Sequence, residues 1–144
     1  MKRILFAALA LFTACTGAFS QSGATLGKIN YQKGEKQAAI IELPYRPEIV
    51  EGALKNKLQT ALVKEARLKG MQVFKGARLT STDGEVVDMY FRVDRRGGKE
   101  AQQSVVYLVL GRPNENIALR APDDTYRLDD ARDFLNELPP VVAA

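Results

Sequence analysis

Two segments, at residues 87–94 and 104–111, constrain the fold of this chain more than any other part of the sequence. In the first, apolar and polar residues alternate: Val87, Met89, Phe91 and Val93 against Asp88, Tyr90, Arg92 and Asp94. This period of two predicts a β-strand with one buried and one solvated side. Ser104–Gly111 is apolar on both sides and predicts the central strand of the sheet.

Other strands are predicted on either side of this pair. Residues 28–32 could form a short N-terminal edge strand, and 38–43 predicts a strand that buries Ala39, Ile41 and Leu43. Met71–Thr80 predicts a further strand, which ends at a turn around Asp83-Gly84.

Two helices complete the predicted elements. Pro47–Lys69 has apolar residues at three- and four-residue spacing, with Pro47 suited to the first helical position and Gly70 to a left-handed stop. A second helix is expected from Asp129-Asp130, whose carboxylates complement the positive helix N-terminus, until Pro139-Pro140 ends it.

The expected order is β-α-β-β-β-α, with a possible extra N-terminal edge strand. This order predicts an α+β fold: a two-layer sandwich of a mainly antiparallel sheet with two helices on one face. We expect a single domain over residues 28–140, preceded by a mobile leader at 21–27 and followed by a tail at 141–144.

The N-terminal residues 1–20 have the pattern of a secretory signal peptide. Lys2 and Arg3 precede an apolar run at 4–13, which is shorter than the roughly 20 residues that a membrane span needs. Ala18-Phe19-Ser20 supplies small residues at both recognition positions, so the predicted cleavage leaves Gln21 first. We therefore expect an exported protein, periplasmic or associated with the outer envelope of a Gram-negative bacterium.

Cys15 offers an alternative to that cleavage. Leu11–Cys15 is similar to a lipobox, in which the cysteine is acylated and becomes the N-terminus, although Phe12 stands where leucine is usual. A membrane-anchored lipoprotein therefore remains the alternative to a free periplasmic form. Cleavage after Ser20 would leave a chain without cysteine and without a transmembrane helix.

The composition excludes several chemistries. The sequence has no histidine and one cysteine, so Ser-His-Asp and Cys-His catalysis, and the usual His/Cys sites for zinc, copper or haem, are not available. No dinucleotide or P-loop motif follows a strand, and no cofactor is expected. Loss of Lys2 and Arg3 lowers the net charge from +4 to +2, which is atypical of a nucleic-acid-binding protein.

Two kinds of charged cluster remain as candidate sites. Arg92, Arg95, Arg96 and Lys99 surround a Gly97-Gly98 turn and could bind lipid phosphate or a glycan carboxylate; a solvated turn is the alternative. Acidic residues could supply calcium ligands in two groups, but neither has the spacing of a calcium loop, so no metal site is predicted. These groups are Asp83, Glu85 and Asp88, and Asp123, Asp124, Asp129 and Asp130.

Several segments resemble a group of uncharacterised exported envelope proteins from Bacteroidota. They are Tyr31-Gln32-Lys33, Ile40–Tyr45, Val73–Gly76 and Asp88–Val93. Members of that group carry a head domain before a long charged coiled coil, whereas this sequence ends at Ala144. The resemblance implies an exported compartment and a domain type, but no activity.

From these observations we expect a non-catalytic binding or scaffolding domain of the periplasm or envelope, with a protein or an anionic glycan or lipid as its partner. An envelope enzyme or enzyme inhibitor that uses carboxylates is the remaining alternative.

Overall fold

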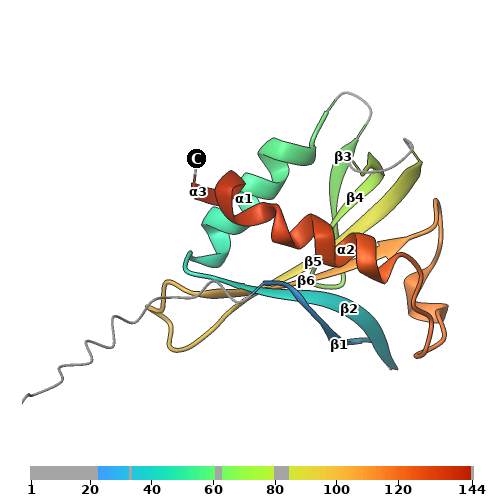
Figure 1. Ribbon diagram of the computed structural model, residues 1–144, viewed down its shortest axis with the longest axis horizontal. Coiled ribbons are helices and arrows are strands. Elements are labelled where there is room, and N and C mark those ends of the chain that lie inside the picture. The colour runs from blue at the N-terminus through green and yellow to red at the C-terminus, as the bar shows by residue number, and fades with distance from the viewer. Residues whose placement is uncertain (1–22, 33, 61–62, 80–84, 144) are drawn as a thin grey trace, which may run out of the picture.

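The computed structural model describes residues 23–32, 34–60, 63–79 and 85–143, which form one six-stranded antiparallel sheet with helices on one face (Figure 1). The strands are β1 Thr25–Tyr31, β2 Gly34–Leu43, β3 Lys64–Leu68, β4 Met71–Arg78, β5 Val86–Arg95 and β6 Ser104–Gly111. The helices are α1 Pro47–Leu58, α2 Leu128–Asn136 and α3 Leu138–Ala143, with a 3₁₀ turn η1 at Ile117–Leu119. The predicted α+β two-layer sandwich is confirmed.

The sheet order is β1-β2-β6-β5-β4-β3, so β6 lies in the interior of the sheet, between β2 and β5. This confirms the prediction that the strand apolar on both sides is central. It pairs with β2 through residues such as Ile41 opposite Val106, and with β5 through Phe91 opposite Leu108. The second and last strands of the sequence order are therefore neighbours in the sheet.

The helix predicted over Pro47–Lys69 is shorter in the structure. It begins at Pro47 and buries Val50, Leu54 and Leu58 as expected, but it ends at Leu58. Residues 64–68 instead form β3, which pairs antiparallel with β4. Lys69 and Gly70 both have a left-handed φ, of 51° and 80°, and form the two-residue turn of the β3–β4 hairpin. The left-handed conformation predicted for Gly70 is confirmed, but it belongs to a β-hairpin turn rather than to the end of a helix.

The N-terminal edge strand begins earlier than predicted. β1 starts at Thr25, so residues 25–27, expected to belong to a mobile leader, pair with β2. The backbone N–H of Ala24 also donates a hydrogen bond to the Asn136 side chain of α2, at 2.7 Å. These contacts fix the start of the described chain to both layers of the sandwich.

The C-terminal tail is also ordered differently from the prediction. Pro139 and Pro140 end α2 as expected, but they lie in the first turn of α3, where a missing N–H is tolerated. Leu138 and Val142 of α3 are buried. Residues 141–143 are therefore part of the helical layer rather than a tail.

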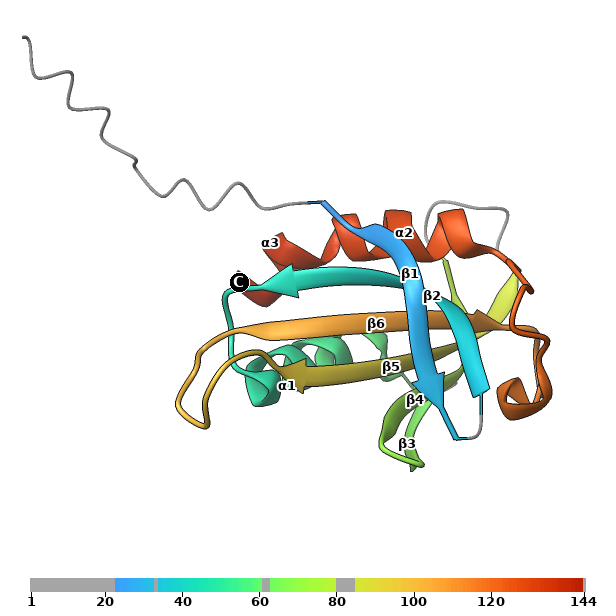
Figure 2. The same cartoon turned by 90° about the horizontal axis from the view of Figure 1, so that it is seen from below.

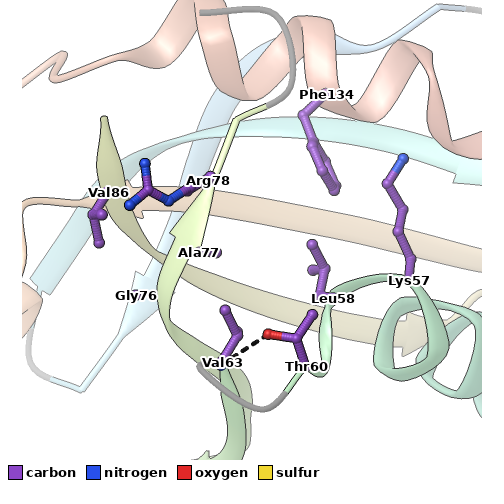
Figure 3. Close-up of a pocket in the computed structure, with 9 residues that line it drawn as sticks. All are labelled: Lys57, Leu58, Thr60, Val63, Gly76, Ala77, Arg78, Val86 and Phe134. Carbon is purple, nitrogen blue, oxygen red and sulfur yellow. Dashed lines mark hydrogen bonds between the residues drawn. The ribbon is translucent and has the colours of Figure 1, made fainter. Parts of the chain in front are cut away.

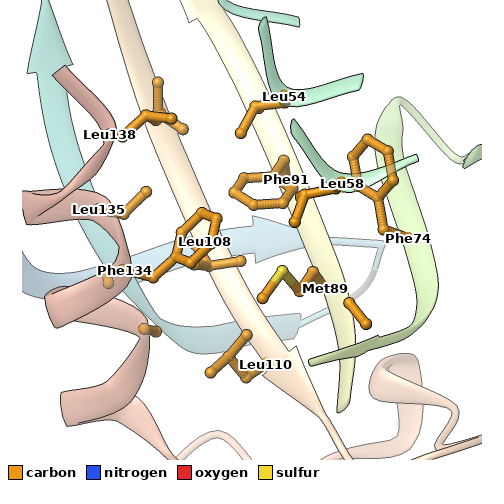
Figure 4. Packing of buried hydrophobic residues seen from close by; sticks show 14 of the residues in the cluster. Leu54, Leu58, Phe74, Met89, Phe91, Leu108, Leu110, Phe134, Leu135 and Leu138 are labelled. Carbon is orange, nitrogen blue, oxygen red and sulfur yellow. The ribbon is translucent and has the colours of Figure 1, made fainter. Parts of the chain in front are cut away.

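The main core lies between the sheet and the helices (Figure 4). Phe91 is at its centre, with its ring 6.0 Å from that of Phe74 and 5.8 Å from that of Phe134. Helix α1 contributes Leu54 and Leu58, and the strands contribute the alternating apolar residues predicted from the sequence. Those residues are Ala39, Ile41, Leu43, Val87, Met89, Phe91, Val106, Leu108 and Leu110.

A second, smaller core lies on the opposite face of the sheet. The β1–β2 hairpin curls across this face toward β4 (Figure 2), and it brings Ile29 and Tyr31 against Met71 and Val73. The loop after β6 adds Ile117 of η1. Asp88 and Tyr90, predicted to face solvent on β5, are buried here, with 2% and 3% of their surface exposed. Over part of β5, therefore, the side chains on both faces of the strand are buried: apolar ones on the helix side and polar ones on the opposite side.

Candidate functional site

A pocket opens at one end of the sandwich, between the C-terminal end of α1, strands β4 and β5, and α2 (Figure 3). Its volume is about 390 Å³, within the range typical of small-molecule sites. Nine described residues line it: Lys57, Leu58, Thr60, Val63, Gly76, Ala77, Arg78, Val86 and Phe134. The pocket is an opening into the main core, because Leu58, Ala77 and Phe134 belong to both.

A β-bulge in β4 gives the pocket its wall. Phe74 pairs with Met89 and Ala77 with Val87, so β4 has one more residue than β5 between these pairs. Gly76 lies in the bulge with φ 75°, a conformation that glycine adopts without strain. The extra residue turns Ala77 back toward the helices, where it is 1% exposed. A small side chain at this position leaves the space that becomes the pocket.

The chain after α1 forms a second wall. The backbone N–H of Val63 donates to the Thr60 hydroxyl at 3.1 Å, and the N–H of Thr60 donates to the Val63 carbonyl at 3.0 Å. These two bonds link Thr60, just beyond the end of α1, to Val63, the residue before β3. The Val63 side chain lies in the main core and is 8% exposed.

Two cationic residues are among those that line the pocket, Lys57 from α1 and Arg78 from β4 (Figure 3). Both sequence neighbours of Arg78 face the main core, and its guanidinium points away from that core toward Val86. The Lys57 ammonium is 5.2 Å from the centre of the Phe134 ring, which places a positive charge beside an apolar wall. Among the described residues that line the pocket there is no carboxylate. The arrangement can therefore accept an apolar group inside, with the Lys57 ammonium beside it.

The opposite face carries a buried polar cluster. The two carboxylate oxygens of Asp88 accept hydrogen bonds from the backbone N–H groups of Gly76 and Asn114, each at 3.0 Å. The Tyr90 hydroxyl donates to the Glu115 carbonyl at 3.0 Å. Burial raises the pKa of Tyr90 to about 12, and the carboxylates of Asp88 and Glu115 add to this shift. Asp88 and Tyr90 thus attach the loop after β6 to β5.

Arg120 forms the centre of the same cluster. Its side chain is 2% exposed, and it donates to Glu115 at 2.7 Å and to the Leu110 carbonyl at 2.9 Å. Its own carbonyl accepts from the buried Lys36 ammonium at 2.8 Å. Burial alone would raise the pKa of Glu115, but hydrogen bonds from Arg120 and Arg112 outweigh it and lower that pKa. These ionised groups are paired and hold the loop in place.

The structure gives three of the predicted anion-binding residues separate partners within the chain. Arg92 donates to the Asn30 carbonyl of β1 at 2.8 Å, Arg95 pairs with Glu48 of α1 at 3.0 Å, and Arg96 pairs with Glu42 of β2. Lys99 is exposed in the turn, and its carbonyl accepts a hydrogen bond from Arg95. An anion at this hairpin would have to compete with two carboxylates, and anion binding there stays a prediction.

The remaining candidates from the sequence have simpler positions. Cys15 and Asp83 lie outside the described residues. Glu85 pairs with Arg127, Asp124 with Arg112, and Asp129 with Arg132. Within residues 23–32, 34–60, 63–79 and 85–143, no three acidic or cysteine side chains gather as a metal ion would require.

Sequence reasoning missed Lys57, Arg78 and Phe134 as neighbours in one pocket. One local signal pointed toward it, since a glycine inside an otherwise regular strand indicates a bulge, and Gly76 occupies such a position. In the part of the chain that the structure describes, no helix has the length and apolar character needed to span a bilayer. Comparison with protein-family models, curated proteins and solved structures finds no match.

Proposed function

We propose that this protein is a non-catalytic binding module of the cell envelope, and that the pocket between α1, β4, β5 and α2 binds an amphiphilic anion. The ligand class is an acyl chain that carries a carboxylate or a phosphate. The observation that carries the proposal is the combination of an apolar pocket of about 390 Å³ with the Lys57 ammonium beside its Phe134 wall.

The pocket supports this ligand class in two ways. Its walls are side chains of the main core, so an acyl chain placed there would continue the packing of Leu58, Val63 and Phe134. Each methylene that leaves water contributes about 0.8 kcal/mol. At the rim, the Lys57 ammonium supplies a point charge for carboxylate or phosphate oxygens. The envelope location rests on the signal-peptide pattern of residues 1–20.

The proposal is tested by calorimetric titration of the purified protein with octanoate, decanoate and dodecanoate. The dissociation constant should fall about fourfold for each added methylene. Decyl phosphate should bind like decanoate, and decyltrimethylammonium should bind more weakly because the Lys57 ammonium repels its charge. Equal affinity for the cationic and anionic amphiphiles, or no dependence on chain length, would contradict the proposal.

Variants locate the binding. Val63→Phe fills the pocket and should abolish binding, with circular dichroism as the check on folding. Lys57→Met keeps the apolar stem and removes the charge, so it should weaken decanoate binding by up to about fivefold. Lys55→Met, two residues earlier on the same helix and outside the pocket lining, is the matched control and should leave the affinity unchanged.

A further inference from the structure

Strand β3 forms one of the two edges of the sheet and is exposed over most of its length. Lys64, Ala66, Arg67 and Leu68 are exposed, and 44% of the surface of Leu68 is accessible. An edge strand presents backbone N–H and C=O groups that another strand can pair with. Proteins commonly prevent such pairing with charged side chains that repel an approaching copy. On β3, however, an acidic and a basic side chain stand on either side of the central residue, so an approaching copy need not be repelled.

We propose that β3 is the contact edge of a homodimer, in which two copies pair their β3 strands antiparallel and continue the sheet from one copy to the other. The sequence of β3 is Lys64-Glu65-Ala66-Arg67-Leu68. When two such strands are centred on Ala66, Glu65 of each copy lies directly opposite Arg67 of the other. The two-fold symmetry produces this pair twice, and opposite charges in directly opposed positions stabilise antiparallel strands.

The neighbouring charges on α1 extend this complementarity. Glu65 and Arg67 lie on the helix side of the sheet, because they pair with Phe74 and Gln72. Within one copy the Lys55 ammonium is 3.6 Å from Glu65, and Arg67 contacts Glu51. In the dimer, Lys55 and Glu65 of one copy would meet Arg67 and Glu51 of the other. From one copy to the other, the order of these four side chains is then Lys55, Glu65, Arg67 and Glu51. Each positive charge in this order is next to a negative charge.

The opposite edge of the sheet does not have this property. β1 runs from Thr25 to Tyr31, and its central residue is Lys28. Antiparallel pairing of two β1 strands would place Lys28 opposite Lys28 of the second copy, which is unfavourable. Arg92 also occupies one carbonyl of β1, that of Asn30, at 2.8 Å. Self-association through the sheet is therefore expected at β3 and not at β1, and this expectation is independent of the pocket and its ligand.

Sedimentation of the purified protein at increasing concentration tests the proposal. The wild type should show a reversible monomer–dimer equilibrium. Arg67→Glu and Glu65→Arg each place like charges opposite one another twice, and each should weaken dimerisation about tenfold or more. The double variant Glu65→Arg/Arg67→Glu restores opposite charges and should dimerise again. Lys28→Glu, on the other edge, is the control and should behave like the wild type.

A mixture of the two single variants separates dimer contacts from folding. At positions 65 and 67, Arg67→Glu has two acidic residues and Glu65→Arg has two basic ones, so the mixture should form heterodimers even though each variant alone is monomeric. Three results would overturn the proposal: a wild type that stays monomeric at every concentration, single variants that dimerise as well as the wild type, or a mixture that does not associate.

Discussion

The two faces of the sheet are stabilised by different means. On the helix side, a continuous apolar core joins α1, α2 and α3 to residues of β2, β4, β5 and β6. On the other side, eight buried residues form a smaller cluster, and buried polar groups surround it, among them Lys36, Asp88 and Arg120. Each of these three makes hydrogen bonds to backbone groups of another segment. Apolar burial thus holds the helices, whereas buried polar groups hold the loop after β6 in one position.

This difference predicts unequal responses to substitution on the central strand. Leu108 is fully buried on the helix side. Leu108→Asp would place an unpaired carboxylate in the main core and should cost several kcal/mol, a large part of the ~5–15 kcal/mol stability of a typical domain. Tyr107→Asp, one residue away on the half-buried opposite side and across from Arg92, should cost much less. Urea unfolding compares them, and equal losses would show that the faces do not differ.

The second prediction concerns the polar face. Asp88→Ala would leave the backbone N–H groups of Gly76 and Asn114 without their acceptor and should lower the free energy of unfolding by about 1–3 kcal/mol. Asp88→Asn keeps one acceptor oxygen and should lose less. Asp94→Ala, at an exposed position on the same strand and side, is the control. A loss no larger than that of the control would mean that Asp88 does not hold the loop.

The third prediction, with the smallest expected effect, concerns Tyr90 on the polar face and the change of protein stability with pH. Tyr90→Phe removes the hydrogen bond to the Glu115 carbonyl and should cost about 0.5–1.5 kcal/mol at neutral pH. Because the pKa of Tyr90 is raised to about 12 in the folded protein, folding favours the neutral phenol. This contribution is complete below pH 10 and declines as the pH rises from 10 to 12.

Chemical denaturation across that range should therefore show a steeper alkaline loss of stability in the wild type than in Tyr90→Phe. Tyr107→Phe, on the same face, keeps Tyr90 and its hydrogen bond to Glu115 and supplies the comparison. Parallel curves for the wild type and Tyr90→Phe would exclude Tyr90 as the group responsible.

The same contrast explains which parts of the fold could be predicted from the sequence. Residues that face the helices follow simple periodicities, and so the strands over 87–94 and 104–111 and the start of α1 were predicted correctly. The strands predicted over 38–43 and 71–80 exist with different bounds, since β2 begins at Gly34 and β4 ends at Arg78. The pattern of Asp88 and Tyr90 on β5 is identical to that of a solvated face. Their burial depends on the loop after β6, which carries no periodic signal of its own. Tertiary contacts, rather than local preference, decide the environment of these two residues.

Errors in the element boundaries have a similar origin. Apolar spacing continues past Leu58 in the sequence, and the switch from helix to strand before Lys64 depends on pairing with β4. The pocket could not be predicted at all, because Lys57, Arg78 and Phe134 come from three elements that are adjacent only in the folded sheet and helix layers. Gly76 alone indicated an irregularity in β4.

The position of β6 has a consequence for how the chain folds. β1 and β2 are the first strands to be synthesised, yet β2 has one neighbour besides β1, and that neighbour is β6, the last strand of the sheet. About sixty residues separate the end of β2 from the start of β6, and closing a loop of this length before it gains contacts slows folding. A two-stranded hairpin alone is marginally stable in water. We therefore expect the β1–β2 hairpin to become stable only once β6 has emerged, and we expect completion of the sheet, rather than formation of any single hairpin, to limit the rate of folding.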